Sequence, residues 1–65
     1  MDCTKTGNLI RELRLKQNMT QLQLAQQMGI SDKTVSKWER GLGCPDVYIL
    51  IELEAALKFS VEQIL

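Results

Sequence analysis

The chain has 65 residues, of which 45% are hydrophobic and 5% are aromatic, and its eight basic and eight acidic residues balance. This size is near the lower limit at which one hydrophobic core holds a fold, so we expect a single domain over residues 1–65. No apolar run approaches the roughly 18 residues that cross a bilayer, and the polar start of the chain has no signal-peptide pattern, so we expect a cytoplasmic protein without membrane contact.

The sequence offers little for catalysis or metal binding. It contains no histidine and no CxxC pattern, and its hydroxyl and thiol groups have no histidine base and no glycine-rich phosphate loop. We therefore expect no metal, no cofactor and no enzymatic activity. Cys3 and Cys44 could pair in principle, but in a cytosolic domain two reduced and unrelated thiols are the favoured interpretation.

The N-terminal quarter predicts a short arm and one helix. Residues 1–5 are expected to form a flexible arm. A helix should begin at about Thr6 or Gly7 and end at Gln17, next to Asn18, because asparagine tolerates the left-handed backbone conformation that often ends a helix. The side chains expected to face the core are Leu9, Ile10 and Leu13.

The stretch from residue 20 to residue 41 predicts a helix-turn-helix motif at 21–40, with helices over 21–28 and about 32–40. Thr20 and Gln23 have the spacing of a capping box, in which the two side chains satisfy free N–H groups at a helix start. Ser31 can cap the second helix in the same way. The helix boundaries are thus specified locally.

Glycines and apolar residues complete the pattern of this motif. Gly29 and Gly41 stand where each helix should end in the left-handed region. Ala25 is small, as the close crossing of two such helices requires. The expected buried residues are Leu22, Leu24, Ala25, Met28, Ile30, Val35 and Trp38. The outer face of the second helix is then polar and mostly cationic: Asp32, Lys33, Thr34, Ser36, Lys37 and Arg40.

The rest of the chain predicts two more helices. The turn-forming segment 41–45 is a loop. Asp46 can cap a helix over 47–57, whose buried face carries Leu50, Leu53 and Leu57. Ser60 and Gln63 form another capping box, which predicts a fifth helix at the end of the chain. With no strand pattern, the expected fold is all-α with five helices.

Charge is unevenly distributed although the total is zero. Through Gly41, seven basic residues face four acidic ones, a net charge of +3. From Leu42 onward, one basic residue faces four acidic ones, a net charge of −3. The basic half coincides with the predicted motif, as expected of a nucleic-acid-binding surface.

These residues carry a resemblance to a known family. The matching positions are Thr20-Gln21, Leu24-Ala25, Gly29-Ile30-Ser31, Val35-Ser36, Trp38-Glu39-Arg40-Gly41 and Pro45. Together they resemble the phage repressor and Cro type of helix-turn-helix, the XRE family of DNA-binding regulators, and the likeness extends over nearly the whole chain from residue 7 to residue 65. It implies a compact, lambda-repressor-like fold and sequence-specific binding of double-stranded DNA by a recognition helix at about 32–40.

In the major groove, side chains on the first two turns of a recognition helix meet the base edges. We therefore expect base contacts from Asp32, Lys33 and Lys37. The two lysines can donate hydrogen bonds to guanine. The alternative is that they only form a solvated surface of the helix and contact no base. Asp32 can accept from cytosine, or it can serve only as a favourable charge at the helix N-terminus.

Contacts to phosphate are expected from residues around the recognition helix. Gln21 begins a helix whose N–H groups can receive a phosphate, and its family counterpart contacts phosphate and braces the recognition helix; an ordinary polar helix start is the alternative. The other expected phosphate ligands are Thr34, Ser36 and Arg40. The loop at 42–44 supplies no cation, which departs from the family pattern.

The resemblance also implies a structural ion pair between Arg14 and Glu39, which would fix the docking angle of the recognition helix. Trp38 is expected to pack against the core, with stacking on a base as the alternative.

The expected function is that of a transcriptional regulator acting as a homodimer on DNA, because two half-sites are usually needed for specific affinity. The dimer contact would come from a small patch on the fifth helix with Val61, Ile64 and Leu65, from the exposed end of the helix over 47–57, or from a region outside this chain. The alternative is an antitoxin-like or adaptor module that binds a protein partner through the acidic C-terminal half, with Glu52, Glu54 and Glu62.

Overall fold

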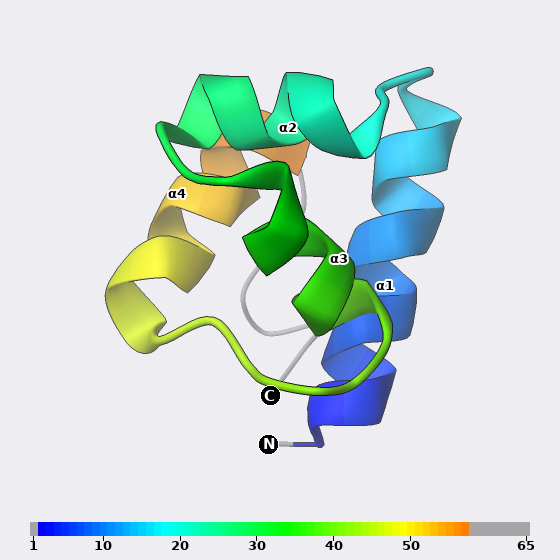
Figure 1. Cartoon of the computed structure of the whole chain (residues 1–65), viewed down its shortest axis with the longest axis vertical. Helices are drawn as coiled ribbons and strands as arrows, with labels where there is room; N and C mark the ends of the chain where they lie inside the picture. Colours follow the sequence, from blue (N-terminus) through cyan, green and yellow to red (C-terminus); the bar gives the residue numbers. More distant parts are fainter. Residues whose placement is uncertain (1, 58–65) are drawn as a thin grey trace.

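The computed structural model describes residues 2–57, and within this range it contains four helices and no strand. In Figure 1 the first helix runs along the right side, the second crosses the top, the third lies in the middle and the fourth lies on the left. The helices are α1 (Cys3–Lys16), α2 (Gln21–Met28), α3 (Asp32–Glu39) and α4 (Val47–Leu57). The all-α prediction is confirmed for this range, whereas the predicted fifth helix lies outside the described residues.

The N-terminal arm is shorter than predicted, because α1 begins at Cys3 and not at Thr6 or Gly7. The carboxylate of Asp2 accepts hydrogen bonds from the backbone N–H groups of Thr4 at 2.9 Å and Lys5 at 3.3 Å. A helix start has free N–H groups, and an aspartate at this position satisfies them. The expectation of a flexible arm over residues 1–5 is therefore wrong for residues 3–5.

The three later helices begin where the caps predicted. The Thr20 and Gln23 capping box is present in both directions, at 3.0 and 2.8 Å. The Ser31 hydroxyl accepts from the N–H of Lys33 at 3.1 Å, and Asp46 accepts from the N–H of Ile49 at 2.9 Å. Because a cap fixes the direction in which a helix leaves its turn, these short-range contacts set the geometry of the bundle.

The core lies between all four helices. Its buried hydrophobic members are Ile10, Leu24, Ala25, Val35, Trp38, Leu50, Leu53 and Leu57. Leu22 was predicted to be buried, but its side chain is 53% exposed, because only one side of α2 faces the core. The end of α1 is also tied to the end of α4, since the Gln17 amide donates to the carbonyl oxygen of Leu57 at 2.6 Å.

The backbones of α1 and α3 approach each other closely at Gly7. A β-carbon on Gly7 would overlap the carbonyl oxygen of Trp38 and lie 3.2 Å from the Cα of Glu39. Only glycine permits this contact, because it has no side chain at all. The close packing of α3 against α1 therefore depends on the absence of a side chain at residue 7.

The two cysteines lie together at the base of the bundle. Cys3 and Cys44 form a disulfide with a Cα–Cα distance of 5.1 Å, so the expectation of unrelated thiols is wrong. Their separation of 41 residues gave no local signal in the sequence. The bond joins the start of α1 to the loop between α3 and α4.

No helix within residues 2–57 is long and apolar enough to span a membrane.

Candidate nucleic-acid interface

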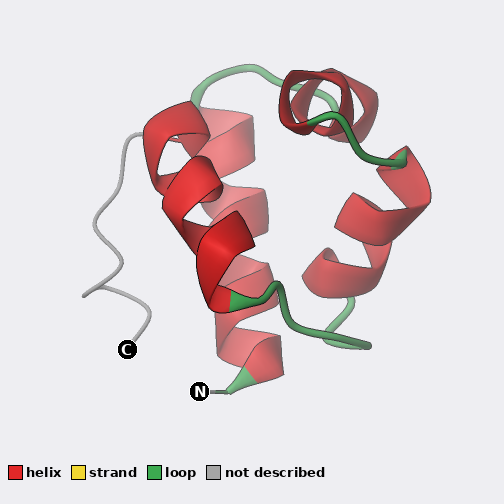
Figure 2. Ribbon diagram, turned by 90° about the vertical axis from the view of Figure 1, so that its left-hand side faces the viewer, coloured by secondary structure: helices red, strands yellow, loops and turns green. Residues whose placement is uncertain are grey.

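Helix α3 lies at one face of the bundle, with one side turned away from the other helices (Figures 1 and 2). Val35 and Trp38 point into the core and hold this helix down. The three residues predicted to contact bases, Asp32, Lys33 and Lys37, are all exposed. The structure thus brings them together on the outer side of one short helix.

The turn between α2 and α3 determines how α3 is placed. Gly29 has φ +69°, a left-handed conformation that favours glycine, and Ala25 is fully buried. The small alanine side chain leaves α3 room to cross close to α2. Ser31 then caps α3, and Asp32 lies in its first turn, where a negative charge is stabilised by the helix dipole.

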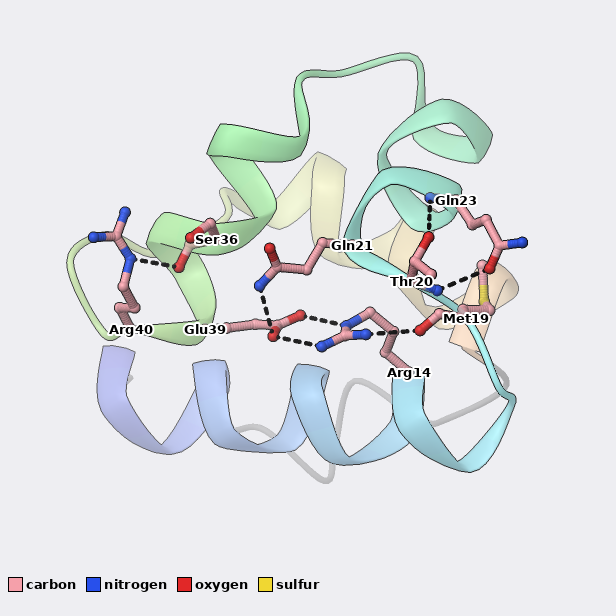
Figure 3. Close-up of polar contacts among 8 residues, drawn as sticks. All are labelled: Arg14, Met19, Thr20, Gln21, Gln23, Ser36, Glu39 and Arg40. Carbon is pink, nitrogen blue, oxygen red and sulfur yellow. Dashed lines mark hydrogen bonds and ion pairs between the residues drawn. The ribbon is translucent and has the colours of Figure 1, made fainter.

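The predicted phosphate ligands on α3 differ in accessibility. Thr34 and Ser36 are partly buried, whereas Arg40 is exposed at the C-terminal end. The Arg40 guanidinium donates from Nε to the backbone carbonyl oxygen of Ser36 at 3.2 Å (Figure 3). This contact caps the helix end and leaves the remaining guanidinium N–H groups of Arg40 free within the described residues.

Behind this face, Arg14 and Glu39 form the ion pair that the resemblance implied. Arg14 donates from Nε to Glu39 Oε2 at 2.7 Å and from Nη2 to Oε1 at 3.0 Å, which is a bidentate pair (Figure 3). The two side chains are only 9% and 4% exposed. A pair with this geometry and so little water around it links α1 to the end of α3 and fixes their angle.

The same two side chains also contact α2 and the turn that precedes it. The Gln21 amide donates to Glu39 Oε1 at 3.1 Å, and Arg14 Nη1 donates to the carbonyl oxygen of Met19 at 2.7 Å. Figure 3 shows these groups meeting where α1, α2 and α3 come together. The Glu39 carboxylate of α3 therefore receives hydrogen bonds from α1 and from α2, and it ties α3 to both helices.

Gln21 connects the start of α2 to the end of α3. Its side chain is partly buried and braces α3 through Glu39, while the residue itself begins α2. The capping box takes up the N–H groups of Thr20 and Gln23 at this helix start. Bracing is thus observed, and contact with phosphate stays a prediction.

Three residues that shape the site were missed by the sequence analysis. Gly7 permits the approach of α1 to α3, the Met19 carbonyl completes the partners of Arg14, and Asp2 starts α1. Asp2 had a usable signal, since aspartate is a preferred helix cap. The other two act through tertiary contacts and have no local signature.

Comparison with known proteins gives the family. The model of a family described as helix-turn-helix matches residues 10–64, which is most of the chain. The chain belongs to this helix-turn-helix family. It is a family of DNA-binding domains, and the resemblance to the XRE type of regulator is confirmed.

Two curated bacterial proteins contain a segment similar to this helix-turn-helix chain. One is the type II methyltransferase M1.ScrFI of Lactococcus lactis subsp. cremoris, 41% identical over a 59-residue alignment that covers 86% of this chain and 14% of that protein. The other is the HTH-type transcriptional activator BcrR of Enterococcus faecalis, 34% identical over 56 residues, which are 86% of this chain and 28% of that protein. The chain thus spans only a small part of each relative. No solved structure gives a significant match.

The part of the helix-turn-helix chain that the structure describes, residues 2–57, contains no group of three potential metal-ligating side chains.

Proposed function

We propose that this chain binds double-stranded DNA in a sequence-specific manner, with α3 in the major groove. The observation that carries the proposal is the position of Asp32, Lys33 and Lys37, which are exposed on a helix that the core and the hydrogen bonds of Glu39 hold in place. A helix held at a constant angle is what base reading requires, because hydrogen bonds to base edges tolerate little displacement.

In this proposal each side chain has a distinct role. Lys33 and Lys37 donate to guanine O6 and N7, and Asp32 accepts from cytosine N4. Phosphate oxygens on either side are bound by Gln21, Thr34, Ser36 and Arg40, which fix the register of the protein on the duplex. Because Arg40 is exposed and cationic, we expect it to supply the largest part of the phosphate attraction.

We further propose that the chain acts as a homodimer on a palindromic site and regulates transcription. A single domain of this size makes few contacts, and two half-sites about one helical turn apart raise both affinity and specificity. The similarity to a transcriptional activator supports the regulatory role. The residues expected to contribute to the dimer, Val61, Ile64 and Leu65, lie outside the described residues.

Selection from a pool of random duplexes tests the proposal most directly. We expect an enriched palindrome whose half-sites are centred about 10 base pairs apart. Recovery of a random pool after repeated rounds would exclude sequence-specific binding. Titration of the enriched duplex against salt should show log affinity falling linearly with log salt, because cationic side chains release counterions from phosphates.

A second candidate function, binding of a protein partner, is favoured by one observation. Four large hydrophobic side chains around the start of α4 are exposed: Leu42, Val47, Tyr48 and Ile51. Tyr48 is the most accessible, at 82%, and the exposed acidic residue Glu52 follows Ile51 on the same helix. Val47, Tyr48 and Ile51 are neighbours on the surface of α4, at three- and four-residue spacing, and exposed apolar side chains that lie together are typical of protein contact surfaces. This alternative predicts that the chain does not bind DNA even at low salt, where attraction to phosphates is strongest.

A further inference from the structure

We propose that Cys3 and Cys44 form a reversible thiol–disulfide switch that sets the stability of the domain. This inference goes beyond DNA binding and does not depend on it. Its basis is the place of the bond in the fold: one sulfur belongs to the first residue of α1, and the other belongs to the loop that leads from α3 to α4.

The disulfide closes a covalent ring around the motif. With a sequence separation of 41 residues, the ring contains all of α1, α2 and α3. A cross-link of this length removes many conformations from the unfolded chain, so its formation stabilises the folded state. In a chain of 65 residues with a small core, this contribution is a large part of the total stability.

Contacts other than the sulfurs hold the two cysteines near each other. Gly41 lies against Thr4, so that a β-carbon on Gly41 would be 3.0 Å from Thr4 Oγ1. Pro45, next to Cys44, is buried, and Asp2, next to Cys3, caps α1. The Cα–Cα distance of 5.1 Å is within the usual range for a disulfide. Because these contacts persist without the bond, the reduced thiols stay at a high local concentration and can re-form it.

The bond is also accessible and dispensable for the core. Both cysteines are partly exposed, and we expect a small thiol to reach a sulfur atom from solvent. Neither cysteine belongs to the cluster of buried hydrophobic residues, which packs without them. Reduction is therefore expected to leave a folded domain with lower stability, in which the loop after α3 is no longer tied to α1.

The exchange uses a small disulfide RSSR as oxidant, such as oxidised glutathione. A protein thiol loses its proton, and the thiolate attacks one sulfur of RSSR, forms a mixed disulfide and releases a thiolate RS⁻, which takes up that proton to give RSH. The second protein thiol likewise loses its proton and, as the thiolate, attacks the protein sulfur of the mixed disulfide, and the second RS⁻ is released and protonated. The net reaction converts two protein thiols and one RSSR into one protein disulfide and two RSH, and reduction is the reverse.

The test is equilibration of the folded protein in reduced and oxidised glutathione mixtures, followed by alkylation of free thiols and mass spectrometry. We expect an intramolecular disulfide that is converted to two alkylated thiols as the share of reduced glutathione rises. A bond that stays intact in 10 mM reduced glutathione, thiols that stay free in oxidised glutathione, or bonds between chains on a non-reducing gel would each overturn the proposal.

Thermal unfolding supplies the second measurement. We expect the oxidised protein to melt at least about 10 °C above the reduced protein. The variant with Cys3→Ser and Cys44→Ser should melt near the reduced wild type in both buffers, which controls for direct effects of the reductant. Equal melting temperatures of oxidised and reduced wild type would contradict the stabilising role, whether or not the chain binds DNA.

Discussion

The carbonyl oxygen of Trp38 occupies the space that a β-carbon on Gly7 would need. Trp38 belongs to α3 and Gly7 to α1, so this contact determines how deeply the exposed helix is seated against its neighbour. The Arg14 and Glu39 ion pair lies further along the same two helices. A loss of the first contact would therefore also pull the ion pair out of alignment.

Replacing Gly7 with alanine should destabilise the protein by roughly 2 to 3 kcal/mol, because the added methyl group forces α1 and α3 apart. The sign is informative, since glycine to alanine in a helix interior is ordinarily stabilising. Urea unfolding measures the change. The matched control is Asn8→Ala, at the exposed next position of α1, which should change stability by less than about 0.5 kcal/mol. A Gly7 variant as stable as wild type would show that the helices do not pack this closely.

Glu39→Ala should cost on the order of 3 kcal/mol, because it leaves the buried Arg14 guanidinium without its carboxylate and also removes the acceptor of Gln21. The control is Glu12→Ala, whose carboxylate is 3.9 Å from Lys16 with both side chains more than 60% exposed. Such surface pairs contribute little, so this variant should unfold almost like wild type. Similar midpoints for the two variants in thermal unfolding would contradict the assigned role of Glu39.

Lys33→Ala and Lys37→Ala should each weaken binding to the selected duplex by about 1 to 3 kcal/mol and change the preferred bases. Both side chains are exposed, so thermal unfolding of the variants should match wild type. Fluorescence anisotropy with the selected and a scrambled duplex measures the ratio of affinities. If both variants keep the wild-type ratio, the assignment of these lysines to base reading is wrong.

Gln21→Ala should lower the affinity for all duplexes by a similar factor and reduce stability by about 1 kcal/mol, because the hydrogen bond to Glu39 is lost. Gln26→Ala, at an exposed position of the same helix, is the control. A stability loss without any change in DNA affinity would assign Gln21 to bracing alone.

Much of the fold was predictable because its signals are local. The caps at Thr20, Ser31 and Asp46 fixed the starts of three helices, and Gly29 and Gly41 take the left-handed conformation expected of them. Such signals depend on hydrogen bonds within four residues, which a single sequence displays directly.

The errors concern features that depend on distant parts of the chain. The exposure of Leu22 is decided by which side of α2 meets α4, and the pairing of Cys3 with Cys44 depends on the whole fold. Within the site, the exposed positions of Asp32, Lys33 and Lys37 followed from helical periodicity. The ion pair at Glu39 came from family resemblance, because nothing in the spacing of 25 residues between Arg14 and Glu39 indicates it.

The hydrogen bonds that orient α3 end at Glu39, whereas the side chains proposed to read bases are exposed and take no part in them. The atoms that hold α3 in place are therefore different from the atoms proposed to contact bases. Exchange of residues 32, 33 and 37 for others should yield folded variants with new operator preferences, so this small domain is a suitable scaffold on which altered specificities can arise or be selected.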